Sequence, residues 1–180
     1  MSSSWSCEIE SAVPAPRLFR ASMMDWHNLA PKLASDKIVS AAVEGDGSVG
    51  SVRQFNFAPG MPFIHVKERF DFIDIASVWM LTHFPILLPT SSLLPFFPNG
   101  AIEKFEVKRS LIEGGGIGTH VESASAHTIF VPKDGGCVVK VVGTYKPLPG
   151  ANTEEEADRE GQGINDRNHQ DCRILSSCQP

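Results

Sequence analysis

The sequence predicts an α+β fold in which antiparallel strands predominate. Two observations predict it: short runs rich in β-branched and aromatic residues recur along the chain, and glycine- or proline-rich turns separate most of them. A third is the composition, since 42% hydrophobic and 21% charged residues in a chain of 180 are typical of a globular protein and not of a disordered or fibrous one. At this length we expect one domain with additional segments.

The first quarter of the chain contains two short helices between its strands. Pro14 and Pro16 suit the first turn of a helix, and apolar residues from Leu18 to Met24 follow at helical spacing. The elements expected here are a strand over 4–11, helices over 18–24 and 28–33, and a strand over 38–43.

Glycine and proline turns divide the remainder into further strands. The turns fall at 44–51, 58–62, 113–118 and 132–136. The expected strands cover residues 52–57, 63–73, 103–111, 120–131 and 137–145. Glu154–Glu156 follow Thr153 as at the start of a helix, because acidic residues favour helix N-termini. No apolar stripe follows, so we expect residues 161–180 to form an irregular tail.

The segment over residues 75–102 differs from its surroundings. Residues 75–101 carry no charged side chain and are rich in Leu, Phe, Pro and Ser. Such a run is long enough for a transmembrane helix. Pro85, Pro89, Pro95 and Pro98 would break that helix. We therefore expect no membrane span, and interpret the segment as an insert between two strands.

Charge and metal-ligand spacing exclude several classes of function. A formal net charge of -5 disfavours binding of nucleic acid through a broad basic face. The four cysteines and six histidines show no metal-ligand spacing, so no metal and no cofactor is expected.

The first ten residues lack the apolar core of a signal peptide. We expect free thiols and a cytoplasmic location, extending to the nucleus.

Several motifs occur in a recognisable order. They are P-A-x-R-L-F at 14–19, N-L-x-P-K at 28–32, E-G-D-G-S-V-G-S at 44–51, F-x-x-V-K-E-R-F-D-F-I-D at 63–74, L-I-E-G-G-G-I-G at 111–118, P-K-D-G-G-C at 132–137 and Y-K-P-L-P-G at 145–150. Together they resemble the Bet v I-type, pathogenesis-related class ten plant proteins, relatives of the major latex proteins with a START-like fold. The resemblance covers residues 4–74 and 103–160. It implies a helix-grip fold, in which a curved seven-stranded antiparallel sheet and two short helices enclose a large apolar cavity with a long carboxy-terminal helix.

The chain departs from this family at two places. Where the family turns directly from the strand near Asp74 to the strand near Glu103, roughly 27 residues intervene here. Their Phe, Leu, Pro and Ser residues are largely specified by pyrimidine-rich codons, so we interpret the insert as a retained intron. At the tail, a shift of one nucleotide allows codons that spell V-E-S-Y-L-L-A-N-P, which resembles the family helix. We therefore expect one domain over 1–160, interrupted at 75–102, with the long helix truncated or degraded by a frameshift.

The resemblance implies binding of small amphipathic molecules, such as cytokinins, flavonoids, sterols or other hormones and metabolites, in a plant defence setting. No catalytic residue is assigned. The residues expected to line the cavity are Met23, Phe57, Phe63, Phe105, Val107 and Tyr145. His65 and Arg109 are expected to make polar contacts with the ligand. His65 shares the strand phase of Phe63, and Arg109 shares that of Phe105.

The glycine-rich loop has a conformational interpretation. Gly45, Gly47 and Gly50 would allow a tight turn with positive φ. A phosphate-binding loop would need a lysine after the last glycine and a helix after the turn, and this loop has neither.

Four alternatives to a carrier stay open. A ribonuclease of this family would use Arg53 and Glu122, but the Glu/Tyr pair of its last helix is missing. An alkaloid synthase would need a lysine beside Tyr145, whereas alternation places Lys140 on the opposite face of the strand. An abscisic-acid receptor would carry S-G-L-P-A, which is absent. The last alternative is an inactive, mis-spliced product. The sequence identifies no protein partner.

Overall fold

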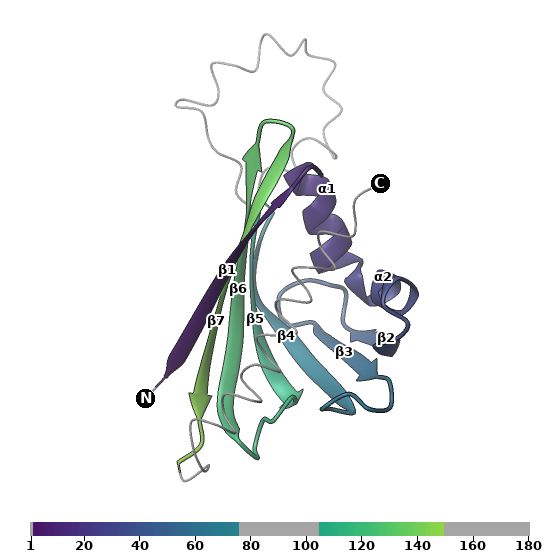
Figure 1. Cartoon of the computed structure of the whole chain (residues 1–180), viewed down its shortest axis with the longest axis vertical. Helices are drawn as coiled ribbons and strands as arrows, with labels where there is room; N and C mark the ends of the chain where they lie inside the picture. Colours follow the sequence, from purple (N-terminus) through teal and green to yellow (C-terminus); the bar gives the residue numbers. More distant parts are fainter. Residues whose placement is uncertain (1, 76–104, 150–180) are drawn as a thin grey trace.

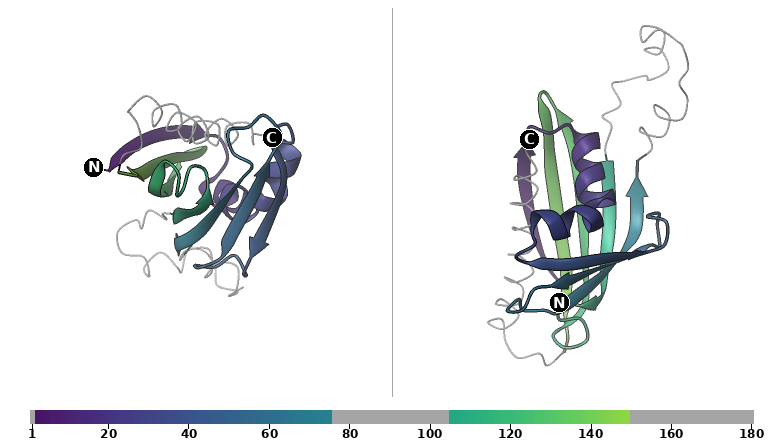
Figure 2. Two further views of the ribbon diagram at one scale, coloured as in Figure 1. Left: turned by 90° about the horizontal axis from the view of Figure 1, so that it is seen from below. Right: turned by 90° about the vertical axis from the view of Figure 1, so that its right-hand side faces the viewer.

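The computed structural model describes residues 2–75 and 105–149, which form one curved antiparallel sheet with helices on one face (Figures 1 and 2). The seven strands are ordered β1-β7-β6-β5-β4-β3-β2. This confirms the α+β class and the seven-stranded sheet. The strands are β1 (Ser3–Ser11), β2 (Ile38–Glu44), β3 (Val52–Phe57), β4 (His65–Asp74), β5 (Phe105–Gly114), β6 (Val121–Lys133) and β7 (Gly136–Pro147).

Two short α-helices joined by a π-helical turn connect β1 to β2. They are α1 (Ala15–Phe19), η1 (Arg20–Met24) and α2 (Trp26–Leu33). The sequence predicted a regular helix over 18–24, but the backbone widens there, and the amide of Asp25 donates to the carbonyl of Arg20 at 2.8 Å. The Ser22 hydroxyl donates to the Leu18 carbonyl at 2.7 Å, and such back-bonding competes with the regular helix.

The hairpin between β6 and β7 shows how local sequence sets strand register. Lys133 pairs with Gly136, which leaves only Asp134 and Gly135 in the turn. Gly135 has a φ of 79°, as the favoured two-residue hairpin turns require, and Asp-Gly is a preferred sequence for them. The register set here continues along the β6–β7 ladder as far as the pair of Ser123 and Lys146.

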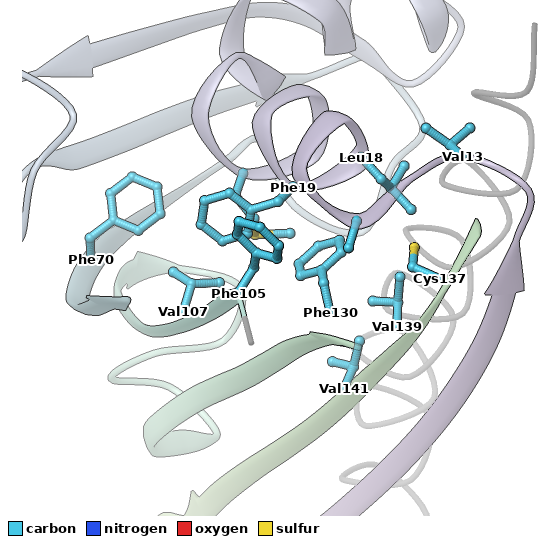
Figure 3. Close-up of a cluster of buried hydrophobic side chains, with 12 residues drawn as sticks. Val13, Leu18, Phe19, Phe70, Phe105, Val107, Phe130, Cys137, Val139 and Val141 are labelled. Carbon is cyan, nitrogen blue, oxygen red and sulfur yellow. The ribbon is translucent and has the colours of Figure 1, made fainter. Parts of the chain in front are cut away.

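The larger hydrophobic core lies between α1 and one end of the inner face, the face of the sheet that carries the helices (Figure 3). Leu18 and Phe19 are buried on α1. The Phe19 ring meets Phe130 edge-on, with centroids 5.4 Å apart, and lies 5.7 Å from Phe105. Because α1 contacts β5, β6 and β7, these aromatic contacts fix the helix against the middle of the sheet.

A second, smaller core forms under α2. Trp26 and Ala30 of this helix pack with Ile38, Phe55 and Val66 of β2, β3 and β4. The two helices therefore cover different parts of the same face. In residues 2–75 and 105–149, no helix is long and apolar enough to cross a membrane.

The strands β4 and β5 pair up to the point where the insert begins. Asp74 pairs with Glu106, so the chain leaves and re-enters the sheet at neighbouring positions. This agrees with the expected hairpin, whereas the insert, the expected helix start at Thr153 and the tail over 161–180 lie outside the described residues.

Deletion of residues 76–104, with Ile75 joined to Phe105 through Asn-Gly, is expected to preserve the sheet. Shortening the loop reduces its closure entropy, and the free energy of unfolding should rise by about 2 kcal/mol. Urea unfolding followed by circular dichroism measures the change. A clear loss of stability would show instead that the deleted segment supports the fold.

Candidate functional site

The inner face of the sheet has two chemically different halves. Under α1, the strands present large side chains, among them Phe105, Phe130 and Val139. Toward the other end the inward positions of β6, Ala124 and Ala126, are small. The ladder row there runs from Arg109 on β5 to Ala126 on β6, Gly143 on β7 and Trp5 on β1.

The next row continues this small-residue half. Leu111 pairs with Ala124, and Ala124 pairs with Tyr145. Ala124, Ala126 and Tyr145 are only half-buried. Over Gly143 the space is taken, because a Cβ there would overlap the Trp5 indole. We call the surface formed by Trp5, Arg109, Leu111, Ala124, Ala126 and Tyr145 the inner-face site.

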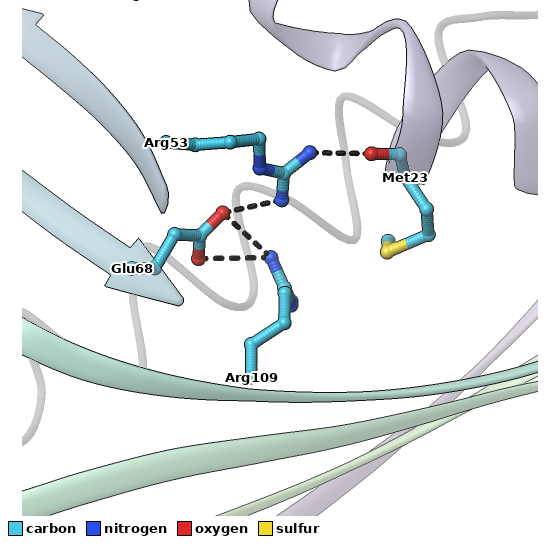
Figure 4. A network of polar contacts seen from close by, with 4 residues as sticks. All are labelled: Met23, Arg53, Glu68 and Arg109. Atoms are coloured by element: carbon cyan, nitrogen blue, oxygen red, sulfur yellow. Dashed lines mark hydrogen bonds and ion pairs between the residues drawn. The ribbon is translucent and has the colours of Figure 1, made fainter. Parts of the chain in front are cut away.

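An ion network lies beside this site (Figure 4). Glu68 on β4 pairs with Arg53 on β3, and its carboxylate also accepts from Nη1 of Arg109, at 3.1 Å to Oε2 and 3.3 Å to Oε1. Arg53 Nη1 donates to the Met23 carbonyl at 2.5 Å. The network therefore ties η1 to three strands of the sheet.

Aromatic rings complete the surroundings of Arg53. Its guanidinium lies 4.5 Å from the centroid of Phe70 and 5.5 Å from that of Phe55. The residue is only 1% exposed, and ring faces attract a cation most strongly where water is excluded. Arg53 is therefore held by a carboxylate, a carbonyl and two rings.

The arginines determine the ionisation of Glu68. Burial raises the pKa of this carboxyl, but Arg109 and then Arg53 lower it by more, so that the pKa lies below its ordinary value. The carboxylate is ionised at neutral pH. The three side chains together then carry one excess positive charge.

Stability should depend on pH through this carboxyl. Above the pKa of Glu68 in the unfolded chain, the stabilisation is complete. As the pH falls below that value, the unfolded chain takes up a proton that the folded chain binds less readily, and stability is lost until the lower folded pKa is passed. Urea midpoints between pH 7 and pH 3 should fall less in Glu68→Gln than in the wild type. Equal falls would contradict this role.

Most of the cavity-lining candidates lie in the two packed cores. Met23, Phe105 and Val107 lie in the core under α1. Phe57 packs against the smaller core, and Phe63 precedes β4. Of the six candidates, Tyr145 alone belongs to the inner-face site, and Arg109 joins it as predicted from its strand phase. The ligand contacts assigned to these residues stay predictions.

The orientation expected for His65 is wrong. The strand begins at His65, and its buried positions are Val66 and Phe70, so His65 has the opposite phase. Its Nε2 lies 2.9 Å from a carboxylate oxygen of Glu113, which is itself exposed. Phe63 lies outside the strand, so the shared phase on which the prediction depended does not exist.

The glycine-rich loop serves the turn between β2 and β3. Gly45, Gly47 and Gly50 have φ values of 105°, 85° and 95°, as the conformational interpretation predicts. The Asp46 carboxylate accepts from the amide of Ser48 at 2.9 Å. The Ser48 side chain and then its amide lower the pKa of Asp46. The amide of Gly50 donates to the carbonyl of Phe70 at 2.7 Å, which ties the loop to β4.

The residues of the enzyme alternatives are not brought together. Arg53 is buried on β3, whereas Glu122 is exposed on β6 and pairs with Lys146 at 2.8 Å. Lys140 pairs with Glu8 at 2.8 Å on the opposite face of β7 from Tyr145, as alternation predicts. Within the described ranges, no group of three or more His, Cys, Asp or Glu side chains could hold a metal ion.

Sequence reasoning missed Glu68 and the two alanines of the inner-face site, Ala124 and Ala126. A usable signal existed for Glu68, because it lies between Val66 and Phe70 at alternate positions of one strand. A charged residue at such a position needs an opposite charge. The partnership of Ala124 and Ala126 with Arg109 and Leu111 depends on strand register, which the sequence did not specify there.

Comparison with known proteins assigns a family to this fold and site. No family model matches the chain. It is 42% identical over 163 residues to "Pathogenesis-related protein 1" of Asparagus officinalis, with 89% of this chain and 86% of the relative covered. It is 32% identical over 143 residues to "Major pollen allergen Bet v 1-M/N" of Betula pendula, with 78% of this chain and 72% of the relative covered.

Solved structures share the fold at lower identity. The crystal structure of Ara h 8.0201 matches with a TM-score of 0.68 at 22% identity, over 98% of this chain and 97% of the other. Norcoclaurine synthase from Thalictrum flavum matches with a TM-score of 0.63 at 19% identity, over 98% of this chain and 86% of the other.

The curved sheet and the two helices define a protein of the helix-grip fold. On sequence identity and coverage, the chain belongs to the Bet v 1, pathogenesis-related family of plant proteins.

Proposed function

We propose that this protein binds small amphipathic plant metabolites or hormones, such as cytokinins, flavonoids or sterols, at the inner-face site, in a defence setting. One observation carries the proposal: the half of the inner face that α1 does not cover has a floor of alanines, Ala124 and Ala126. Small side chains leave room above a sheet, and the apolar groups around them favour an apolar ligand.

The rim of the site supports an amphipathic ligand in particular. Leu111 and the Trp5 indole supply apolar contact, and the Tyr145 hydroxyl and the Arg109 guanidinium supply polar groups. Sites for small molecules combine a mainly apolar surface with a few placed polar groups of this kind. The solved relatives share the same scaffold.

A dye-displacement titration tests the proposal. Nile red should fluoresce with the wild-type protein and be displaced by kinetin, a cytokinin, or naringenin, a flavonoid. Ala126→Trp should weaken binding at least about tenfold, because the larger side chain fills the space over the floor.

Ser125→Trp is the matched control. Ser125 is the neighbouring residue of β6, is exposed, and lies on the outer face. The same side chain is added there without entering the site, so displacement should be unchanged. Equal binding by both variants would show that ligands bind elsewhere, and absence of displacement by either compound from the wild type would contradict the proposal.

A cytoplasmic location, extending to the nucleus, belongs to the same proposal. Cys137 is a buried free thiol, and burial raises its pKa above the ordinary value. A thiol of this kind suits a reducing compartment. Fluorescence microscopy of the tagged full chain in plant cells tests the location.

A further inference from the structure

The buried ion network joins two guanidinium groups to one carboxylate. Two guanidinium groups, those of Arg53 and Arg109, share the carboxylate of Glu68, and the side chains of Arg109 and Glu68 are 11% and 17% exposed. A charge at such a position is costly unless it is paired. Any donor left unpaired in this network therefore favours a further acceptor.

Among the residues that the structure describes, Arg109 has an unpaired donor in this network. Arg53 already contacts the Met23 carbonyl and the faces of Phe55 and Phe70. Arg109 contacts Glu68 through Nη1 alone, and its buried Nε has no hydrogen-bond partner. Within the described ranges, Glu68 is its one carboxylate partner.

The geometry of a guanidinium defines what the remaining side can bind. The Nε–H and Nη2–H donors lie parallel along one edge and match the two oxygens of a carboxylate. No hydrogen bond joins that edge of Arg109 to a described residue. The Nη1 contacts with Glu68 hold the guanidinium in place, and the buried Nε on its other edge lacks a described acceptor.

Strand register places Arg109 at the border of the alanine floor. Arg109 is the direct partner of Ala126 in the β5–β6 ladder, and Leu111 on the same face of β5 is the partner of Ala124. A ligand lying over the two alanines would thus have its end next to Arg109. Glu68 lies on the other side of Arg109, on β4.

We propose that the protein selects amphipathic ligands that carry a carboxylate, and that Arg109 binds this carboxylate through its Nε–Nη2 edge while the apolar body of the ligand lies over Ala124 and Ala126. The inference rests on the proposed function, since it names the ligand class of the same site. Glu68 is a positioning residue that orients Arg109 and does not touch the ligand.

The test compares dodecanoate with 1-dodecanol by displacement of Nile red at pH 8. The two probes share one apolar chain and differ in their end group. The preference for dodecanoate should fall about tenfold in Arg109→Met, because a charge-assisted hydrogen-bond pair is lost while an unbranched apolar stem is kept. Arg109→Met leaves Glu68 paired with Arg53, so the variant keeps a balanced pair.

Lys108→Met is the matched control. It removes the same charge from the adjacent, exposed position of β5, where the ammonium lies 5.6 Å from the centroid of Phe72 on the outer face. The preference for dodecanoate should be unchanged in this variant. An equal fall in both variants would indicate a general electrostatic effect and overturn the inference.

The outcomes separate this inference from the proposed function. Binding of both probes with the same ratio in wild type and Arg109→Met overturns the carboxylate site and leaves the proposed function standing. Binding of neither probe overturns the inference alone, because displacement by kinetin or naringenin decides the proposed function. A second measurement needs no variant: the pKa of carboxyl-labelled dodecanoate, followed by carbon NMR in the wild-type complex, should fall below that of the free acid. An unchanged or raised pKa would overturn the inference.

Discussion

Replacement of Glu68 by glutamine should lower the free energy of unfolding by about 3 kcal/mol, because two buried guanidinium groups lose their shared carboxylate. Glutamine preserves the size of the side chain, so the loss reports charge rather than packing. Since single domains are stable by only about 5–15 kcal/mol, the midpoint of urea unfolding should shift clearly.

Two controls distinguish the charge effect from a local disturbance. Glu122→Gln breaks an exposed pair with Lys146 and should cost less than about 1 kcal/mol. Adding Arg109→Met to Glu68→Gln removes the excess charge and should restore part of the lost stability, as a double-mutant cycle would detect. Additive losses in the double variant would contradict the proposed coupling of the two residues.

Replacement of Phe130 by alanine should cost about 3–5 kcal/mol, because the side chain is fully buried and the remaining cavity cannot collapse between a helix and a sheet. The Phe130 ring packs edge-on against Phe19, with ring centroids 5.4 Å apart. Loss of the Phe130 ring therefore also weakens the packing of α1 against the sheet. Urea unfolding gives the stability, and near-ultraviolet circular dichroism reports the aromatic packing.

Val142→Ala is the corresponding control on β7. Val142 is 43% exposed and lies on the outer face, so its truncation should change stability by less than about 1 kcal/mol. A small loss in Phe130→Ala, similar to that of the control, would show that α1 does not depend on the aromatic contact.

Local sequence predicted the strands well because residues with turn preferences, such as glycine, mark where the strands end. Gly135, at a position that needs positive φ, ends β6 at the expected turn. The β-branched runs then define strands that agree with the predictions to within a few residues. The errors occur where a neighbouring side chain changes the backbone, as Ser22 does in η1, or where a turn extends further than expected, as it does before His65.

The sequence by itself determined the antiparallel sheet, the two helical regions and the inward phase of Arg109, since all of these depend on patterns within a few residues. Only the tertiary structure decided which groups meet Arg109. Glu68 is 41 positions away from Arg109 in the chain. Ala126 is the partner of Arg109 only through strand register. Pairing across strands depends on the packing of the whole sheet, so no local preference could specify the charge balance or the alanine floor of the site.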